Sequence, residues 1–164
     1  MAALSPGTNA PDFTLSDARG KTHVLGELLS AGPVLAVFFK VTCPTCRLAF
    51  PYIERLNQAY GDCVPFLGVA QDPLPEAMVF AQENGKATFP LCSDGPDYPV
   101  STLYGITNVP TLFAIERGGR IAATSVGFSK RDYRELAGIL ADWSDRLVTD
   151  LFPQGDPAPE LKPG

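Results

Sequence analysis

The sequence has few of the residues that metal centres and disulfide-rich folds require. It holds one histidine, His23, and four cysteines in 164 residues. Four cysteines are too few to staple a chain of this size into a fold without a core. The longest apolar run, Val34–Phe39, is far shorter than the about 20 residues that a membrane-spanning helix needs. An apolar content of 45% instead predicts a globular chain with an ordinary hydrophobic core.

Basic residues are also scarce. Lysine and arginine number 13 against 18 acidic residues, which gives a net charge of −5 and a pI of about 4.8. Because nucleic acids and anionic membranes attract basic surfaces, neither is expected as a partner. Residues 1–10 lack the basic start and long apolar stretch of a secretion signal. We therefore expect a cytoplasmic location, or an extracytoplasmic one if a leader has been removed.

The alternation of apolar patterns predicts an α/β fold. Val34–Phe39 lies between turn signals, which is typical of a strand that is buried on both faces in the middle of a mostly parallel sheet. After it, apolar residues recur at three- and four-residue steps, which indicates an amphipathic helix from Pro44 to about Tyr60. Similar patterns predict strands at 64–70, 111–116 and 120–126, and helices at 75–84 and 130–148.

The two ends of the chain are expected to differ from this core. Residues 12–15 and 22–25 read as a short N-terminal strand pair around a turn. Residues 151–164 contain prolines and little apolar material, so we expect a flexible tail after a single domain of residues 1–150. The whole predicts a central mixed β-sheet flanked by helices, with an N-terminal β extension.

The segment Cys43-Pro44-Thr45-Cys46 carries the chemistry of the sequence. It lies where the buried strand meets the amphipathic helix, and the start of a helix has partial positive charge and unpaired backbone N–H groups. Both favour a thiolate, so the pKa of Cys43 should fall. Pro44 presets the backbone of the first helical turn, and Cys46 lies one turn further. The pattern predicts that Cys43 attacks a disulfide and that Cys46 resolves the mixed disulfide.

The residues leave three other interpretations of this pair open. A metal site would need more ligands, whereas the chain offers only His23 and the isolated Cys63 and Cys92. A purely structural disulfide would close a strained, short loop. The third interpretation is a pair of idle buried thiols. We expect Cys63 and Cys92 to pack in the core, and His23 to be a surface strand residue.

A second candidate site precedes the strand at 111–116. In Asn108-Val109-Pro110-Thr111, a proline enters a strand after a polar residue and a valine, which makes Pro110 a candidate for a cis bond. An extended segment held beside the cysteines could pair with the backbone of a substrate. The other interpretation is an ordinary trans proline at the start of an edge strand.

Together these motifs resemble the thioredoxin superfamily. The likeness is carried by the CxxC at a strand–helix junction, by Val109–Thr111 before an apolar strand, and by the Gly118-Gly119 hairpin. The stretches 7–15 and 17–21 are similar to its redoxin branch, which includes TlpA/ResA-type thiol–disulfide oxidoreductases and the alkyl hydroperoxide reductase/thiol-specific antioxidant proteins. The resemblance covers about residues 5–148 and implies a thioredoxin-like sandwich.

The resemblance also implies an activity and its partners. The enzyme would exchange its Cys43–Cys46 pair with protein or small-molecule thiols and disulfides, with no cofactor beyond that redox-active pair. It would need a thiol reductant and would be a monomer or a weak dimer. In this family the proline at the position of Pro110 is cis and faces the CxxC. Substrate contacts are expected from Pro44, Thr45, Val109 and Pro110.

The sequence departs from the family pattern at several places. Thr42 stands where members often have tryptophan, and Ala49 and Val37 stand where carboxylates often assist proton transfer. Lys40, three residues before the first cysteine, is a candidate to stabilise a thiolate, or a lysine whose ammonium reaches solvent at a strand end.

Two further functions remain as alternatives. Residues 89–94 and 104–106 resemble peroxiredoxins, which predicts reduction of hydroperoxides. Those enzymes typically have threonine three residues before the reactive cysteine, whereas Lys40 stands there before Cys43, so disulfide exchange is favoured. The remaining alternative is a binding module on the same fold without catalysis.

Overall fold

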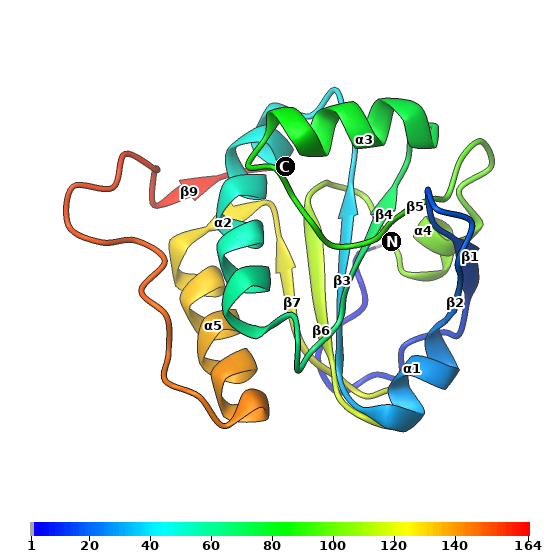
Figure 1. Ribbon diagram of the computed structural model, residues 1–164, viewed down its shortest axis with the longest axis horizontal. Helices are drawn as coiled ribbons and strands as arrows, with labels where there is room; N and C mark the ends of the chain where they lie inside the picture. Colours follow the sequence, from blue (N-terminus) through cyan, green and yellow to red (C-terminus); the bar gives the residue numbers. More distant parts are fainter. Residues whose placement is uncertain (1) are drawn as a thin grey trace.

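A computed structural model describes residues 2–164 and shows a mixed sheet between two layers of helices (Figure 1). Within these residues no helix is long and apolar enough to cross a membrane. The elements, in chain order, are β1 (Thr14–Ser16), β2 (Thr22–Val24), α1 (Leu25–Ala31), β3 (Val34–Phe39), α2 (Pro44–Tyr60), β4 (Phe66–Ala70), α3 (Leu74–Glu83), β5 (Leu91–Ser93), α4 (Pro99–Leu103), β6 (Thr111–Ile115), β7 (Ile121–Val126), β8 (Phe128–Ser129), α5 (Lys130–Ser144) and β9 (Leu161–Lys162).

The central sheet has five strands in the order β5-β4-β3-β6-β7. The apolar run of β3 forms its middle strand, and all six of its residues are buried. This strand pairs in parallel with β4 and antiparallel with β6, while β6 and β7 form the antiparallel hairpin at one edge. The predicted mixed sheet and hairpin are therefore confirmed. The CxxC motif lies at the carboxyl end of the middle strand.

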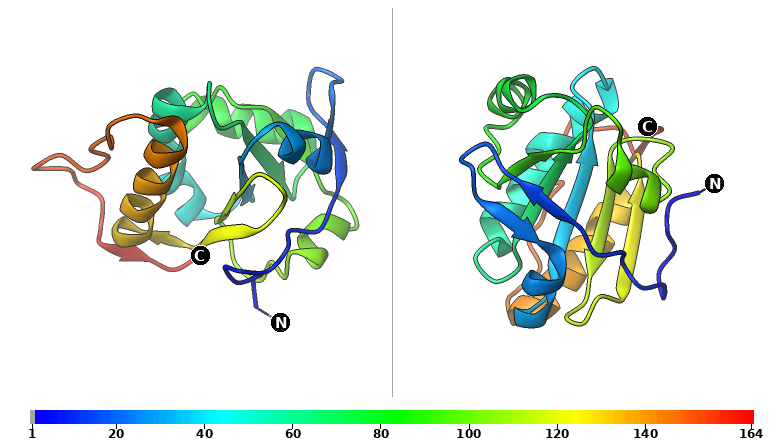
Figure 2. Two further views of the ribbon diagram at one scale, coloured as in Figure 1. Left: turned by 90° about the horizontal axis from the view of Figure 1, so that it is seen from below. Right: turned by 90° about the vertical axis from the view of Figure 1, so that its right-hand side faces the viewer.

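Each face of the sheet has its own apolar core. Alternate β3 side chains point to opposite faces, so Val37 and Phe39 join the cluster beneath α2, α3 and α5, whereas Ala36 and Phe38 join the cluster beneath α1 and α4. The N-terminal strands β1 and β2 form a separate antiparallel sheet, as the sequence predicts. This small sheet lies on the same side of the central sheet as α1 and α4. The two further views show this division of helices between the faces (Figure 2).

The helix ends have local causes in the sequence. Helix α2 begins with Pro44 at its first position, where the missing N–H costs no helical hydrogen bond. Helix α5 begins after Ser129, whose hydroxyl accepts a hydrogen bond from the N–H of Asp132. It ends at Ser144, before the predicted boundary at 148, because Asp145 adopts a left-handed conformation with φ 52°.

Residues 151–164 differ from the flexible tail that their prolines suggest. Leu151 and Phe152 are buried, and the Phe152 ring centroid lies 5.0 Å from that of Tyr52 and 5.9 Å from that of Phe128. The chain then turns between Pro153 and Asp156, where the Asp156 N–H donates to the Pro153 carbonyl at 2.9 Å, and the last part of the segment forms β9, which pairs with β8. A few well-placed apolar side chains thus order a segment whose average composition indicates disorder.

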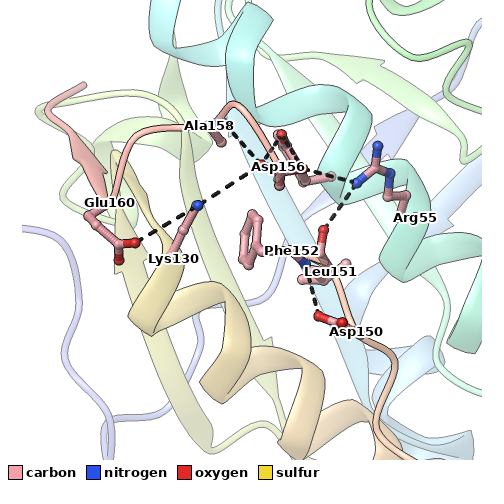
Figure 3. A network of polar contacts seen from close by, with 9 residues as sticks. Arg55, Lys130, Asp150, Leu151, Phe152, Asp156, Ala158 and Glu160 are labelled. Atoms are coloured by element: carbon pink, nitrogen blue, oxygen red, sulfur yellow. Dashed lines mark hydrogen bonds and ion pairs between the residues drawn. The ribbon is translucent and has the colours of Figure 1, made fainter. Parts of the chain in front are cut away.

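One buried carboxylate anchors the middle of this segment (Figure 3). The side chain of Asp156 is 5% exposed and accepts hydrogen bonds from the Tyr52 hydroxyl at 2.8 Å and the Ala158 N–H at 2.9 Å. Its carboxylate also forms ion pairs with Arg55 at 3.7 Å and Lys130 at 4.0 Å. The segment is therefore fixed to both α2 and α5.

Candidate active site

The two cysteines of the CxxC motif occupy different environments one helical turn apart. Cys43 is the N-cap residue of α2 and is half-buried, whereas Cys46 lies inside the first turn and is fully buried. Both are free thiols, and the Cys43 sulfur accepts a hydrogen bond from the backbone N–H of Cys46 at 3.1 Å. The Cys43 sulfur is therefore accessible to a substrate, while the Cys46 sulfur is shielded from solvent.

The surroundings of Cys43 favour its ionised form. A hydrogen bond from the Cys46 side chain makes the largest contribution and outweighs the opposing effect of partial burial. Backbone N–H groups of Cys46 and Thr45 and the positive charge of Lys162 act in the same direction. Together they lower the pKa of Cys43 to about 6, so this sulfur is mainly thiolate at neutral pH.

The surroundings of Cys46 have the opposite effect. Burial removes water from its sulfur and raises the pKa of the Cys46 thiol far above its usual range. The hydrogen bond to Cys43 and the negative charges of Cys43 and Asp72 raise it further. The pair thus shares one proton that stays on Cys46.

The second predicted site lies directly against the first. The Val109–Pro110 peptide bond is cis, and the Val109 carbonyl oxygen lies 3.2 Å from the Cys43 sulfur, from which it accepts a hydrogen bond when Cys43 is protonated. The loop is held from both sides, since the Pro110 carbonyl accepts from the Gly127 N–H at 2.8 Å and the Thr111 hydroxyl donates to the Asn108 carbonyl at 2.7 Å. The structure therefore brings together segments that are 66 residues apart in the sequence.

Thr45 points to a neighbour that the sequence did not suggest. Its hydroxyl donates a hydrogen bond of 2.6 Å to the carbonyl of Pro163, at the far end of the chain. Pro44 occupies the first position of α2 between Cys43 and Thr45. The four expected substrate contacts, Pro44, Thr45, Val109 and Pro110, thus lie around Cys43. The end of the same chain already touches two of them, Thr45 and Val109.

Two charged residues near the cysteines escaped the sequence reasoning. The Asp72 carboxylate accepts a hydrogen bond of 2.8 Å from the Val41 N–H and is close enough to raise the pKa of Cys46. Asp72 follows β4 and the CxxC motif follows β3. Because these two strands are parallel neighbours, their pairing could have predicted that Asp72 lies near the cysteines. The lysine whose charge lowers the pKa of Cys43 is Lys162, whereas Lys40 is exposed. No local pattern indicates that Lys162 reaches this site.

The remaining candidate residues lie elsewhere. Cys92 is buried, as predicted, whereas Cys63 is exposed, so the prediction of a core position for Cys63 is wrong. The expectation that His23 lies on the surface is also wrong, because its Nε2 is buried against Asp17 at 2.8 Å. A hairpin only three residues long on each strand still buries one side chain against the sheet edge. Within residues 2–164 no group of three or more potential ligands could hold a metal ion.

Comparison with known proteins places this geometry in a family. The Redoxin family model matches residues 5–140. The thiol–disulfide oxidoreductase ResA of Geobacillus thermodenitrificans is 32% identical over 136 residues, covering 81% of this chain and 76% of that protein. ResA of Bacillus subtilis is 27% identical over 126 residues, covering 76% and 69% of the two chains.

Solved structures show the same fold. A putative thiol:disulfide interchange protein DsbE from Chlorobium tepidum superposes with a TM-score of 0.74 and 29% identity, over 86% of this chain and 99% of that one. A putative protein disulfide isomerase from Bacteroides thetaiotaomicron gives a TM-score of 0.79 at 22% identity, over 89% and 96%. The matched sequence, the CxxC at the start of α2 and the cis proline loop agree: the chain belongs to the redoxin family of the thioredoxin superfamily.

Proposed function

We propose that this redoxin is a thiol–disulfide oxidoreductase in which Cys43 is the nucleophile and Cys46 is the resolving thiol. The observation that carries the proposal is the pairing of an accessible sulfur, whose pKa is about 6, with a buried thiol whose N–H and side chain hydrogen-bond to it. A structural disulfide or a pair of idle thiols gives no reason for one sulfur to be ionised and reachable. The similarity to ResA proteins supports the same activity.

The reaction conserves atoms and electrons through two exchanges. The Cys43 thiolate attacks one sulfur of a substrate disulfide, the substrate S–S bond breaks, and one substrate thiolate leaves. Cys46 then loses its proton and attacks the Cys43 sulfur, which releases the second substrate thiolate. The substrate gains two electrons, and the Cys43–Cys46 pair becomes a disulfide. A thiol reductant restores the dithiol, and the reverse sequence oxidises a substrate dithiol.

The proposed substrate contacts follow from the positions around Cys43. The cis peptide loop at Val109 and Pro110 supplies backbone groups at the attacking sulfur, which suits an extended substrate segment. Pro44 and Thr45 form the opposite rim at the start of α2. No cofactor beyond the cysteine pair is needed, because both electrons reside in the sulfur atoms.

Single-turnover exchange tests this assignment. The assay uses the reduced protein with Cys63→Ser in every variant, because the exposed Cys63 would also react. Freed of reductant, this protein is mixed with the small aromatic disulfide DTNB, and the released thiolate is counted. The parent protein should release both halves of DTNB, whereas Cys46→Ser should release one half and retain the other as a mixed disulfide visible by mass. Cys43→Ser should lose the fast phase. Equal fast release from Cys43→Ser would refute the assignment. Loss of peroxide sustained by dithiothreitol at a rate above disulfide exchange would replace the function with a peroxidase.

A further inference from the structure

The last four residues of the chain, Leu161–Gly164, form a strap across the active site. Its first part is β9, in which Lys162 pairs with Phe128 and Leu161 with Ser129. It then passes Gly127 so closely that a Cβ atom on that glycine would lie 3.0 Å from the Lys162 carbonyl oxygen. Pro163 has no N–H and ends the strand pairing. In Figure 1 the chain end lies beside the start of α2.

The end of the strap contacts both rims of the site around Cys43. On one side, the Thr45 hydroxyl donates to the Pro163 carbonyl at 2.6 Å. On the other, the Asn108 side-chain amide donates to the Gly164 carbonyl at 3.0 Å. The strap therefore bridges the start of α2 and the cis peptide loop, the two segments that flank the nucleophile.

Gly164 lies directly on the backbone of Val109. A Cβ atom built on Gly164 would be 2.3 Å from the Val109 carbonyl oxygen, 3.0 Å from its carbonyl carbon and 3.2 Å from its nitrogen. Only the absence of a side chain permits this approach. The strap thus covers the peptide group whose oxygen accepts the hydrogen bond from Cys43.

The strap is held from behind by the segment that precedes it. Phe152 packs against Tyr52 of α2 and Lys130 of α5. Asp156 accepts a hydrogen bond from the Tyr52 hydroxyl, and Figure 3 shows it between Arg55 and Lys130, with which it forms ion pairs. The Lys130 N–H also donates to the Glu160 carbonyl at 3.0 Å, just before β9. Residues 151–160, which we call the tether, therefore hold the strap at the site. The contacts of the tether do not involve the strap, so the tether remains when the strap is removed.

We propose that the strap occupies the place where the backbone of an extended polypeptide would pair with Val109, so that the enzyme favours small disulfides over disulfides within polypeptides. The inference rests on the proposed function. A polypeptide bound by strand addition needs the backbone groups of the loop, which Gly164 covers. A small disulfide needs only the half-buried Cys43 sulfur. A polypeptide must first displace the strap and break its two side-chain hydrogen bonds to the rims.

Two variants test the proposal in different ways. A chain that ends after Glu160 lacks the strap but keeps the tether. Gly164→Ala keeps Lys162 and its charge, while the new Cβ atom cannot coexist with the Val109 carbonyl in the present arrangement. Gly138→Ala is the matched control, because a Cβ atom at this helical glycine meets nothing within 4 Å. Rates of exchange of the reduced proteins are measured with DTNB and with insulin, whose disulfides lie within polypeptides.

The ratio of the insulin rate to the DTNB rate should rise about 5- to 30-fold in both strap variants, the effect expected from losing one or two net hydrogen bonds. It should stay unchanged in Gly138→Ala. An unchanged or lower ratio in either strap variant would overturn the proposal while leaving disulfide exchange intact. If the parent and every variant fail to exchange with DTNB, the proposed function itself is wrong. Comparing the ratio cancels any change in the pKa of Cys43 when Lys162 is removed.

Discussion

The ionisation of Cys43 should depend mainly on its partner Cys46. The Cys46 side chain provides the largest contribution to the low pKa of Cys43, ahead of the backbone N–H groups and Lys162. Replacing Cys46 by alanine removes that hydrogen bond but keeps the start of α2 and its backbone donor. Cys46→Ser supplies a hydroxyl donor at the same place and serves as the matched control.

The size of the effect follows from the strength of the bond. A hydrogen bond to a charged group is worth about 1.5–3 kcal/mol, and a pKa unit corresponds to about 1.4 kcal/mol. Because Cys43 is half-exposed, solvent weakens the interaction, and we expect a rise of about one unit, from about 6 to about 7. At pH 6 the thiolate fraction would then fall from about one half to about one tenth.

The rate of alkylation by iodoacetamide as a function of pH measures this pKa directly. The parent protein should show a midpoint near pH 6, with about 90% thiolate at pH 7, against about 3% for an ordinary cysteine. Cys63 is an exposed free thiol that iodoacetamide also reaches, so the site of alkylation is assigned by mass spectrometry of peptides. A parent midpoint above pH 8, or an identical midpoint in Cys46→Ala, would refute the account of the site.

Three further predictions concern stability. Phe39→Ala should lower the free energy of unfolding by about 3–5 kcal/mol in urea, because the ring is fully buried against two other rings; a loss below about 1 kcal/mol would contradict this. Asp156→Asn should expose the tether to limited proteolysis, whereas Asp97→Asn at an exposed position should not; equal cleavage of both would disprove the anchoring role. Asp17→Asn should cost about 2 kcal/mol at neutral pH, since His23 and two backbone N–H groups bond its carboxylate. The His23 hydrogen bond lowers the pKa of Asp17 in the folded protein, so this stabilisation is complete above about pH 4 and is lost as the pH falls further. The free energies of unfolding of the variant and the parent, measured by chemical denaturation, should therefore converge in acid. A difference that stays constant with pH would contradict this.

Much of the fold could be predicted because its central elements carry strong local signals. Strand β3 is one uninterrupted apolar run, and helix α2 starts at Pro44 and keeps its periodicity to Tyr60, so both have their predicted bounds. Short elements were less well defined. Strand β1 comes two residues later than expected, since three residues give too little pattern to fix a boundary.

The cysteine pair could also be predicted, because CxxC at a strand–helix junction is a local motif. Its electrostatic partners could not. Asp72 and Lys162 reach the site through tertiary structure, from a neighbouring strand end and from the chain end. The same limitation explains residues 151–164, where composition predicts disorder but Phe152 and Asp156 find specific partners on α2 and α5. Composition describes the average of a segment, whereas packing depends on single side chains.

The asymmetry of the two thiols sets the order of events during turnover. In the resting dithiol, burial above all, and then the bond to Cys43 and its charge, keep the proton on Cys46. Once Cys43 is joined to a substrate sulfur, its charge is gone, and only burial and the negative charge of Asp72 still oppose ionisation of Cys46. Capture of the substrate therefore lowers the pKa of Cys46 and makes this sulfur a better nucleophile. The internal disulfide forms only from the mixed disulfide, because its formation needs an acceptor for two electrons and the substrate sulfur is that acceptor. Since Cys43 is already mainly ionised at neutral pH, a further rise in pH accelerates the attack by Cys46 and the release of product, and not the capture of substrate.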